Sequence, residues 1–297
     1  MPRQPVPDIP TLRTICHRGK LSHDRRAWYA LQRRISIYLT WLLLHTGLEA
    51  NQVTSASVLL ALIGSAMLAF RSPVLAVCGA AALAVHHLLD KVDGDIARFR
   101  SHHSIVGVYL DELGHGVAFA GIFLGLGLHV AWAAPSAGAA IADLTAGSLG
   151  AIAMVMGRAQ KSIGFLLYAQ HALGHPELIP DQVTDPKWAG LSRDAAHRDR
   201  GSEAPSVGHQ AIAARLRDLA LQLSDFSVML VLVLGGAIVE LLGGGPLLLR
   251  GVLYAGAAIH LVMLAALVAI NVAVNVKSEV ARLTALGSDR NDAQPRE

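Results

Sequence analysis

The chain has 297 residues, of which 53% are hydrophobic and only 16% are charged. Soluble domains carry closer to a quarter charged residues, so this composition excludes an ordinary soluble domain and predicts an integral membrane protein. The net charge of +3 gives no indication of nucleic-acid binding, and the two cysteines indicate neither a disulfide framework nor a cysteine-based metal site.

The N-terminal region combines a basic segment with a short apolar one. Residues 1–34 are polar and rich in arginine, and an apolar stretch that contains Tyr38 and Trp41 follows from Ile35 to Leu48. The stretch is too short to cross a bilayer comfortably, and a basic end followed by aromatic and leucine side chains is typical of a helix in the headgroup region. We therefore predict an interfacial helix within an N-terminal segment at 1–50, with no cleavable secretory signal.

Six longer apolar segments follow, each long enough for a helix that crosses the hydrocarbon core. They cover residues 52–70, 73–90, 104–133, 137–157, 225–243 and 250–274. The sequence therefore predicts an all-α integral membrane protein with six transmembrane helices in a domain at 51–276. A polar insertion at 158–224, with an amphipathic segment at 209–223, interrupts this domain, and residues 277–297 form a polar C-terminal tail.

The positive residues are distributed unequally between the two sides of these six spans. Lysine and arginine gather in the N-terminus, in the connections at 91–103 and 158–224 and in the tail, whereas the other side has only Arg71 and Arg250. Positively charged connections favour the cytoplasmic side of a membrane. We therefore expect a multi-pass protein of the inner (plasma) membrane with both termini and the basic connections in the cytoplasm.

Acidic residues interrupt the second and third apolar segments where these meet the basic side. Asp90 and Asp93 are three residues apart, and Gly107, Asp111 and His115 recur every four residues, so each set shares one helix face. Two helices joined by a short loop can direct Asp90, Asp93, Asp111 and His115 into one pocket at the cytoplasmic end. Such a cluster of hard ligands suits Mg²⁺ or Mn²⁺.

The spacing D-x2-D-G-x2-A-R-x8-G-x3-D-x3-H resembles the signature of the CDP-alcohol phosphotransferase family, in which the last residue is aspartate. Seven of its eight fixed positions match, namely Asp90, Asp93, Gly94, Ala97, Arg98, Gly107 and Asp111. The family has six membrane helices, and its motif bridges the second and third. The resemblance extends more weakly to Asn51 and Thr54 at the entry to the first span, where Ala50 replaces the usual proline.

The resemblance implies a reaction in phospholipid biosynthesis. A CDP-linked donor would bind metal through its pyrophosphate, an alcohol hydroxyl would attack the β-phosphorus, and CMP would leave. The expected donor is CDP-diacylglycerol, although a CDP-linked small alcohol with a lipid acceptor stays open, as do the acceptor's identity and a homodimer. The implied ligands of Mg²⁺ or Mn²⁺ are Asp90, Asp93, Asp111 and His115. The implied substrate contacts are Asn51, Thr54, Gly94, Ala97, Arg98 and Gly107.

His115 is the one departure from the family signature. It replaces the aspartate that is the family's proposed base for the acceptor hydroxyl, and a histidine can act as a base or as a metal ligand at neutral pH. His115 and Asp111 are therefore the candidate catalytic residues. The replacement removes one negative charge, which predicts weaker binding of a second metal ion and leaves a non-catalytic homologue open as an alternative.

A rival function from another class is an ion-coupled transporter, because carboxylates within a membrane also bind cations and protons. A transporter would favour acids near the middle of the bilayer, whereas these lie at a helix end. Arg158 and Lys161, at the cytoplasmic end of the fourth span, are candidate phosphate contacts or ordinary positive anchors.

Other polar residues receive structural interpretations. His86 and His87 lie one turn before the motif and would support the site from behind or serve packing. We expect Asp95 to be solvated or at a helix terminus. Asp143 and Glu240 are predicted near the surface on the outer side.

Overall fold

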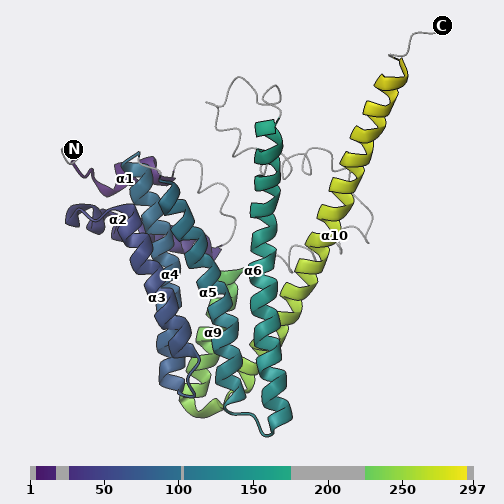
Figure 1. Ribbon diagram of the computed structural model, residues 1–297. Coiled ribbons are helices and arrows are strands. Elements are labelled where there is room, and N and C mark those ends of the chain that lie inside the picture. The colour runs from purple at the N-terminus through teal and green to yellow at the C-terminus, as the bar shows by residue number, and fades with distance from the viewer. Residues whose placement is uncertain (1–4, 18–26, 102–103, 175–224, 293–297) are drawn as a thin grey trace, which may run out of the picture. The chain divides into compact units, whose positions relative to one another are not determined.

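The computed structural model describes residues 5–17, 27–101, 104–174 and 225–292, and these residues are organised into helices and short connections (Figure 1). The α-helices are α1 (Ile9–His17), α2 (Ala27–Thr46), α3 (Ala50–Leu68), α4 (Pro73–Phe99), α5 (Ile105–Ala131), α6 (Ala137–Gly174), α9 (Phe226–Val239) and α10 (Leu247–Asp292), and a π-helical turn, η2 (Glu240–Gly244), extends α9. This confirms the predicted all-α class.

Among the residues that the structure describes, six helical segments are long and apolar enough to cross a membrane, as predicted. They are Ala50–Leu68, Pro73–Phe99, Ile105–Ala131, Ala137–Gln160, Phe226–Gly244 and Leu247–Ala269. Helix α2 is not among these six segments, which agrees with an interfacial position for the N-terminal region. The chain is therefore a multi-pass membrane protein. The second span is longer than the apolar run predicted at 73–90 because the helix continues through the acidic motif to Phe99, whereas the third span nearly coincides with the run predicted at 104–133.

The described chain divides into two compact units. The first comprises Met1–Val155 and Ser224–Val262, and the second comprises Met156–Leu223 and Met263–Glu297. Helix α6 continues to Gly174 within the predicted polar insertion, and α10 continues to Asp292 within the predicted tail. The predicted amphipathic segment at 209–223 lies outside the described residues. The candidate site lies in the first unit.

Helices α3 and α4 pack at very short range because glycines face each other across their interface. The two helices are joined by a tight turn, in which Ser72 caps α4 and Pro73 occupies its first turn. A Cβ atom added at Gly79 would lie 2.6 Å from the carbonyl oxygen of Gly64 and 2.8 Å from the backbone nitrogen of Leu68. Small residues permit this close backbone approach, as in other membrane helix pairs.

Gly79→Ala is therefore expected to destabilise the protein, because the added methyl group would overlap the backbone of α3. Overpacking of this kind costs about 1–3 kcal/mol. Gly251→Ala in α10 is the matched control, since a Cβ there meets no atom within 4 Å and alanine favours helices. Thermal unfolding in detergent measures both variants, and equal midpoints would contradict the packing argument.

The N-terminal helices α1 and α2 pack against the motif-bearing helix α4 through a small apolar cluster. Figure 1 shows α1 and α2 beside one end of α4, and both helices pack against it. The buried residues of this cluster are Leu12, Cys16, Ile37, Leu44, Val53, Val92 and Ile96. The end of α4 that carries the motif is thereby covered by protein on one face, which the sequence pattern does not predict.

The opposite end of the first unit holds a buried ion pair. The carboxylate of Asp143, on α6, is 1% exposed and accepts hydrogen bonds from Nε and Nη2 of Arg250 at 3.0–3.2 Å. Nη2 of Arg250 also donates to the carbonyl oxygen of Val130 at 3.0 Å. Nearby, Glu240 pairs with His129 at 2.7 Å. The expectation that Asp143 lies near the surface is wrong, because α5 and α10 cover it.

Candidate active site

The site forms where the end of α4 meets the beginning of α5. Ser104 caps α5, because its side-chain oxygen accepts a hydrogen bond from the backbone N–H of Gly107 at 2.9 Å. The same hydroxyl donates to Oδ1 of Asn51 at 3.0 Å and so connects α3 to this corner. Three helices are therefore held together at the end where the motif lies.

An open cavity of about 270 Å³ lies between these helices. Nine of the predicted site residues line it, namely Asn51, Thr54, Asp90, Asp93, Gly94, Ala97, Arg98, Gly107 and Asp111, together with Ala50, Ser104 and Val108. The structure thus brings together residues from three helices that the motif spacing predicts to converge.

Glycine leaves room at two points of the cavity wall. A Cβ atom at Gly107 would lie 2.7 Å from Oδ1 of Asn51, which would displace that side chain from its contact with Ser104. A Cβ atom at Gly94 would approach Nη1 of Arg98 to 3.2 Å. The absence of side chains at these positions keeps the cavity open and lets a ligand approach the backbone.

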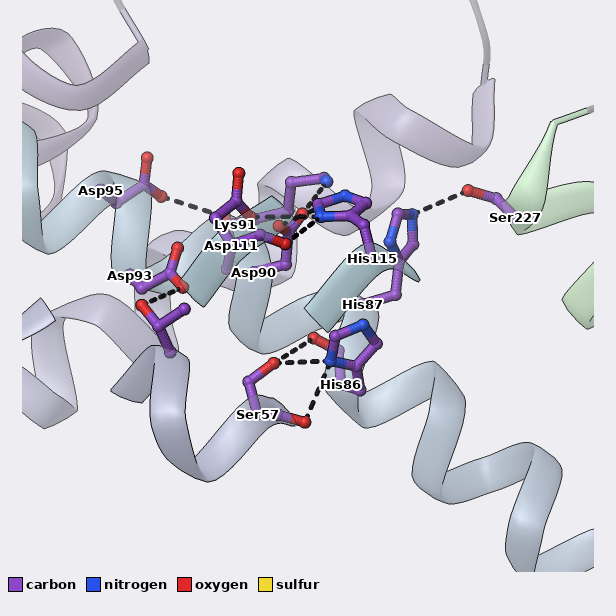
Figure 2. A network of polar contacts seen from close by, with 12 residues as sticks. Ser57, His86, His87, Asp90, Lys91, Asp93, Asp95, Asp111, His115 and Ser227 are labelled. Carbon is purple, nitrogen blue, oxygen red and sulfur yellow. Dashed lines mark hydrogen bonds and ion pairs between the residues drawn. The ribbon is translucent and has the colours of Figure 1, made fainter. Parts of the chain in front are cut away.

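Two carboxylates and an imidazole form a compact group beside this cavity. Asp90, Asp111 and His115 each offer a ligand atom, and these atoms all lie within 4.8 Å of one another. Nε2 of His115 is 3.6 Å from Oδ1 of Asp90, and Nδ1 is 3.2 Å from Oδ1 of Asp111 (Figure 2). Hard oxygen donors and an imidazole at this separation can share one divalent cation.

The tautomer of His115 follows from its contacts. Its Nδ1 lies 2.9 Å from the backbone carbonyl oxygen of Asp111, and a carbonyl oxygen only accepts hydrogen bonds. Nδ1 therefore carries the proton in the neutral ring, and Nε2 carries the lone pair. The lone pair is on the side of Asp90, where it can bind a cation or accept a proton.

Asp93 lines the same cavity but is held by a different partner. Its carboxylate is 8% exposed, and Oδ2 accepts a hydrogen bond from the hydroxyl of Thr54 at 2.7 Å. The compact group of three does not include Asp93. Of the four predicted ligands, three therefore gather as expected, and the fourth faces the cavity from the next turn of α4.

Lys91 is a site residue that the sequence reasoning missed. Its ammonium group contacts Oδ2 of Asp90 and brings a positive charge into the acidic group (Figure 2). Its position between two motif aspartates was the available indication, but the motif leaves this residue unspecified. The cation partly offsets the negative charge of Asp90, Asp93 and Asp111.

The two histidines that precede the motif are buried and point to different helices. His86 lies with Nδ1 2.6 Å from the hydroxyl oxygen of Ser57 on α3. His87 lies with Nε2 2.9 Å from the hydroxyl oxygen of Ser227 on α9. Figure 2 shows both rings beside the acidic group rather than within it. Both contacts join α4 to a neighbouring helix, which agrees with the packing interpretation.

The expectation that Asp95 is solvated is wrong, although the residue does lie near the end of α4. This residue is 0% exposed, and its carboxylate forms an ion pair with Arg98 and a contact with His17. Helices α1 and α2 cover the face of α4 that carries it, so the side chain is buried in protein rather than solvated. Sequence spacing alone shows which face a residue occupies but not what covers that face.

The remaining predicted residues lie in the second compact unit. Arg158 is partly buried on α6, and Lys161 follows it on the same helix, although its side chain lies outside the described part of the chain. Their assignment as phosphate contacts stays a prediction.

Comparison with known proteins identifies the region that contains this site. Residues 48–165 match the family model described as CDP-alcohol phosphatidyltransferase. No curated protein matches the chain. The matched range includes all of α3, α4 and α5, and hence every residue that lines the cavity.

Proposed function

Residues 48–165 belong to the CDP-alcohol phosphatidyltransferase family, and from this premise we propose that the protein transfers a phosphatidyl, or other substituted phosphoryl, group from a CDP-linked donor to an alcohol with release of CMP. The proposed donor is CDP-diacylglycerol, whose acyl chains can remain between helices while the nucleotide occupies the polar cavity. The observation that carries this proposal is one cavity lined by Asp90, Asp93, Asp111 and the glycines of the motif.

The donor set fits a divalent cation such as Mg²⁺ or Mn²⁺. Asp90 and Asp111 would hold it, because their carboxylate oxygens already lie within 4.8 Å of each other, and Asp93 faces the same cavity, so that the lone pair on Nε2 of His115 stays available as a base. A divalent ion neutralises charge on the pyrophosphate and thereby favours phosphoryl transfer. The fixed ammonium group of Lys91 adds a positive charge beside Asp90.

The chain's own residues would then position the reactants. Arg98 would contact donor phosphate, while Gly94, Ala97 and Gly107 give the nucleotide room to approach the helices, and Asn51 and Thr54 border it from α3. The acceptor oxygen forms a bond to the β-phosphorus, the bridging P–O bond breaks, and CMP leaves with the electron pair. We assign the hydroxyl proton to Nε2 of His115, with Asp111 orienting the ring through Nδ1.

The membrane placement is proposed from charge. Lysine and arginine lie mainly in the connections at the motif end, so the active site would face the cytoplasm, and the plasma membrane is the proposed location.

The direct test is CMP release by purified protein in lipid nanodiscs. CDP-diacylglycerol with Mg²⁺ or Mn²⁺ and a panel of polar alcohols should yield CMP and a new lipid, and chelation by EDTA should stop both. Failure of every donor and acceptor to yield CMP would reject the enzyme, and ion flux that depends on Asp93 would then favour the transporter.

The role of His115 has its own test. His115→Ala should lower CMP release about 10²–10⁴-fold, because a positioned base typically contributes that factor. His115→Asp should retain or raise activity, since it restores a carboxylate that can bind metal or accept a proton. CMP release under saturating donor measures both variants. Unchanged activity in His115→Ala would remove the proposed proton transfer.

A further inference from the structure

The carboxylate of Asp95 connects two parts of the molecule through its two oxygen atoms. Oδ2 faces the N-terminal helices, lying 3.1 Å from Nε2 of His17 and accepting a hydrogen bond from the hydroxyl of Ser36 at 3.2 Å. The hydroxyl of Thr40 lies 3.5 Å from Oδ2, and its single proton is shared with the backbone carbonyl oxygen of Ser36 at 2.8 Å. Oδ1 instead pairs with Nη2 of Arg98. One fully buried group therefore joins α1 and α2 to a residue that lines the cavity.

Arg98 is held at the cavity wall by this contact. Its guanidinium group lies over Gly94, and Asp95 engages only Nη2. Nε is buried and has no hydrogen-bond partner among the residues that the structure describes. A guanidinium group has five N–H donors, so Arg98 retains donors that an anionic oxygen in the cavity can satisfy.

Attachment of the N-terminal helices does not by itself explain a buried charge at this position. The apolar cluster around Leu12, Ile37 and Val92 already packs α1 and α2 against α4. Burial of an ion pair is often no more stabilising than apolar packing of the same volume. What the carboxylate adds is orientation, because an arginine fixed before binding loses less side-chain entropy when its ligand arrives.

We propose that Asp95 is a positioning residue that, together with His17, Ser36 and Thr40, holds the Arg98 guanidinium against the cavity so that it binds a phosphate oxygen of the CDP-linked donor. The N-terminal helices are then part of the donor site. This inference rests on the proposed function for its ligand, and it adds a requirement for residues outside the motif, three of which lie in the N-terminal helices.

The first experiment measures steady-state CMP release by the full-length protein in nanodiscs. Asp95→Asn has nearly the same shape but no charge, and it should raise the KM for CDP-diacylglycerol about tenfold while kcat and the acceptor KM change less than threefold. Ser36→Ala combined with Thr40→Val should raise the donor KM two- to fivefold. Asp143→Asn is the matched control, because it removes charge from another buried Asp–Arg pair and should leave the donor KM unchanged.

A double-mutant cycle tests whether Asp95 acts through Arg98. The donor KM of Asp95→Asn/Arg98→Ala should equal that of Arg98→Ala alone, since an absent guanidinium cannot be positioned. Additive effects would overturn the inference. An Asp95→Asn variant that loses thermal stability, as we expect for Asp143→Asn, but keeps the wild-type donor KM would also overturn it.

Binding of CDP separates this inference from the proposed function. Titration calorimetry with CDP and Mn²⁺ should show about tenfold weaker nucleotide binding in Asp95→Asn, whereas Mn²⁺ binding followed by electron paramagnetic resonance should be unchanged. Absence of CMP release from the wild type would reject the transferase but leave this readout intact. Equal CDP affinity in wild type and Asp95→Asn would reject the positioning role.

Discussion

Asp93→Asn should abolish CMP release, with a fall of at least about 10³-fold in kcat/KM. The substitution keeps the size of the side chain, and asparagine can still accept the hydrogen bond from Thr54. It removes one negative charge from a cavity whose proposed ligand is a metal–pyrophosphate complex, and phosphoryl transfer depends mainly on positioning and charge neutralisation. CMP release at saturating metal and donor is the measurement.

Asp143→Asn serves as the control for this result. It makes the same change at a buried aspartate near the other end of α5. Val130, which shares Arg250 with Asp143, is 19 positions after Asp111 on that helix, a rise of about 28 Å at 1.5 Å per residue. This control should lose thermal stability yet retain CMP release per folded molecule within about twofold. Activity in Asp93→Asn that equals the control's would show that the charge of Asp93 is dispensable, and the proposed metal site would need revision.

Arg250→Leu should destabilise the protein by about 3–5 kcal/mol, the range observed when one partner of a buried ion pair is removed. The variant leaves the carboxylate of Asp143 buried without its guanidinium partner. It also removes the hydrogen bond to the carbonyl oxygen of Val130, so α5, α6 and α10 lose a shared contact. Unfolding in detergent, followed by helical circular dichroism against temperature or denaturant, measures the loss.

The double variant Asp143→Leu/Arg250→Leu distinguishes loss of a charge partner from loss of packing. It leaves no unpaired charge, so most of the stability should return. Recovery of less than about half of the lost free energy of unfolding would indicate that packing, rather than the ion pair, contributes most of the stability at this end. CMP release per folded molecule should remain near wild type in both variants because they lie far from the cavity.

The predicted part of the site followed from helical periodicity. Asp90 and Asp93 share a face of α4, Asp111 and His115 share a face of α5, and the short connection between the helices makes these faces meet. The compact group of Asp90, Asp111 and His115 confirms that convergence. This reasoning succeeds because every step involves residues that are close in sequence or joined by a short turn.

Helical periodicity did not predict contacts between segments that are distant in the sequence. Asp95 is 78 residues from His17 and Asp143 is 107 residues from Arg250, and both aspartates were expected near solvent. The contact of Lys91 with Asp90 was not predicted for a different reason. The two residues are adjacent, but the long lysine side chain can adopt several rotamers that point in different directions. A charged residue in an apolar chain predicts a polar or charged partner, but its sequence position does not show which residue that partner is.

The sequence by itself determined the class of the protein, its six apolar spans and the residues of the motif, because composition and local periodicity depend on neighbours along the chain. Tertiary structure decided which of those residues meet, with Asp93 directed to Thr54 and His115 to Asp90 and Asp111. It also decided that α1 and α2 cover Asp95. The physical reason is that burial and pairing depend on which helix faces pack together, and segments far apart in the sequence supply those faces.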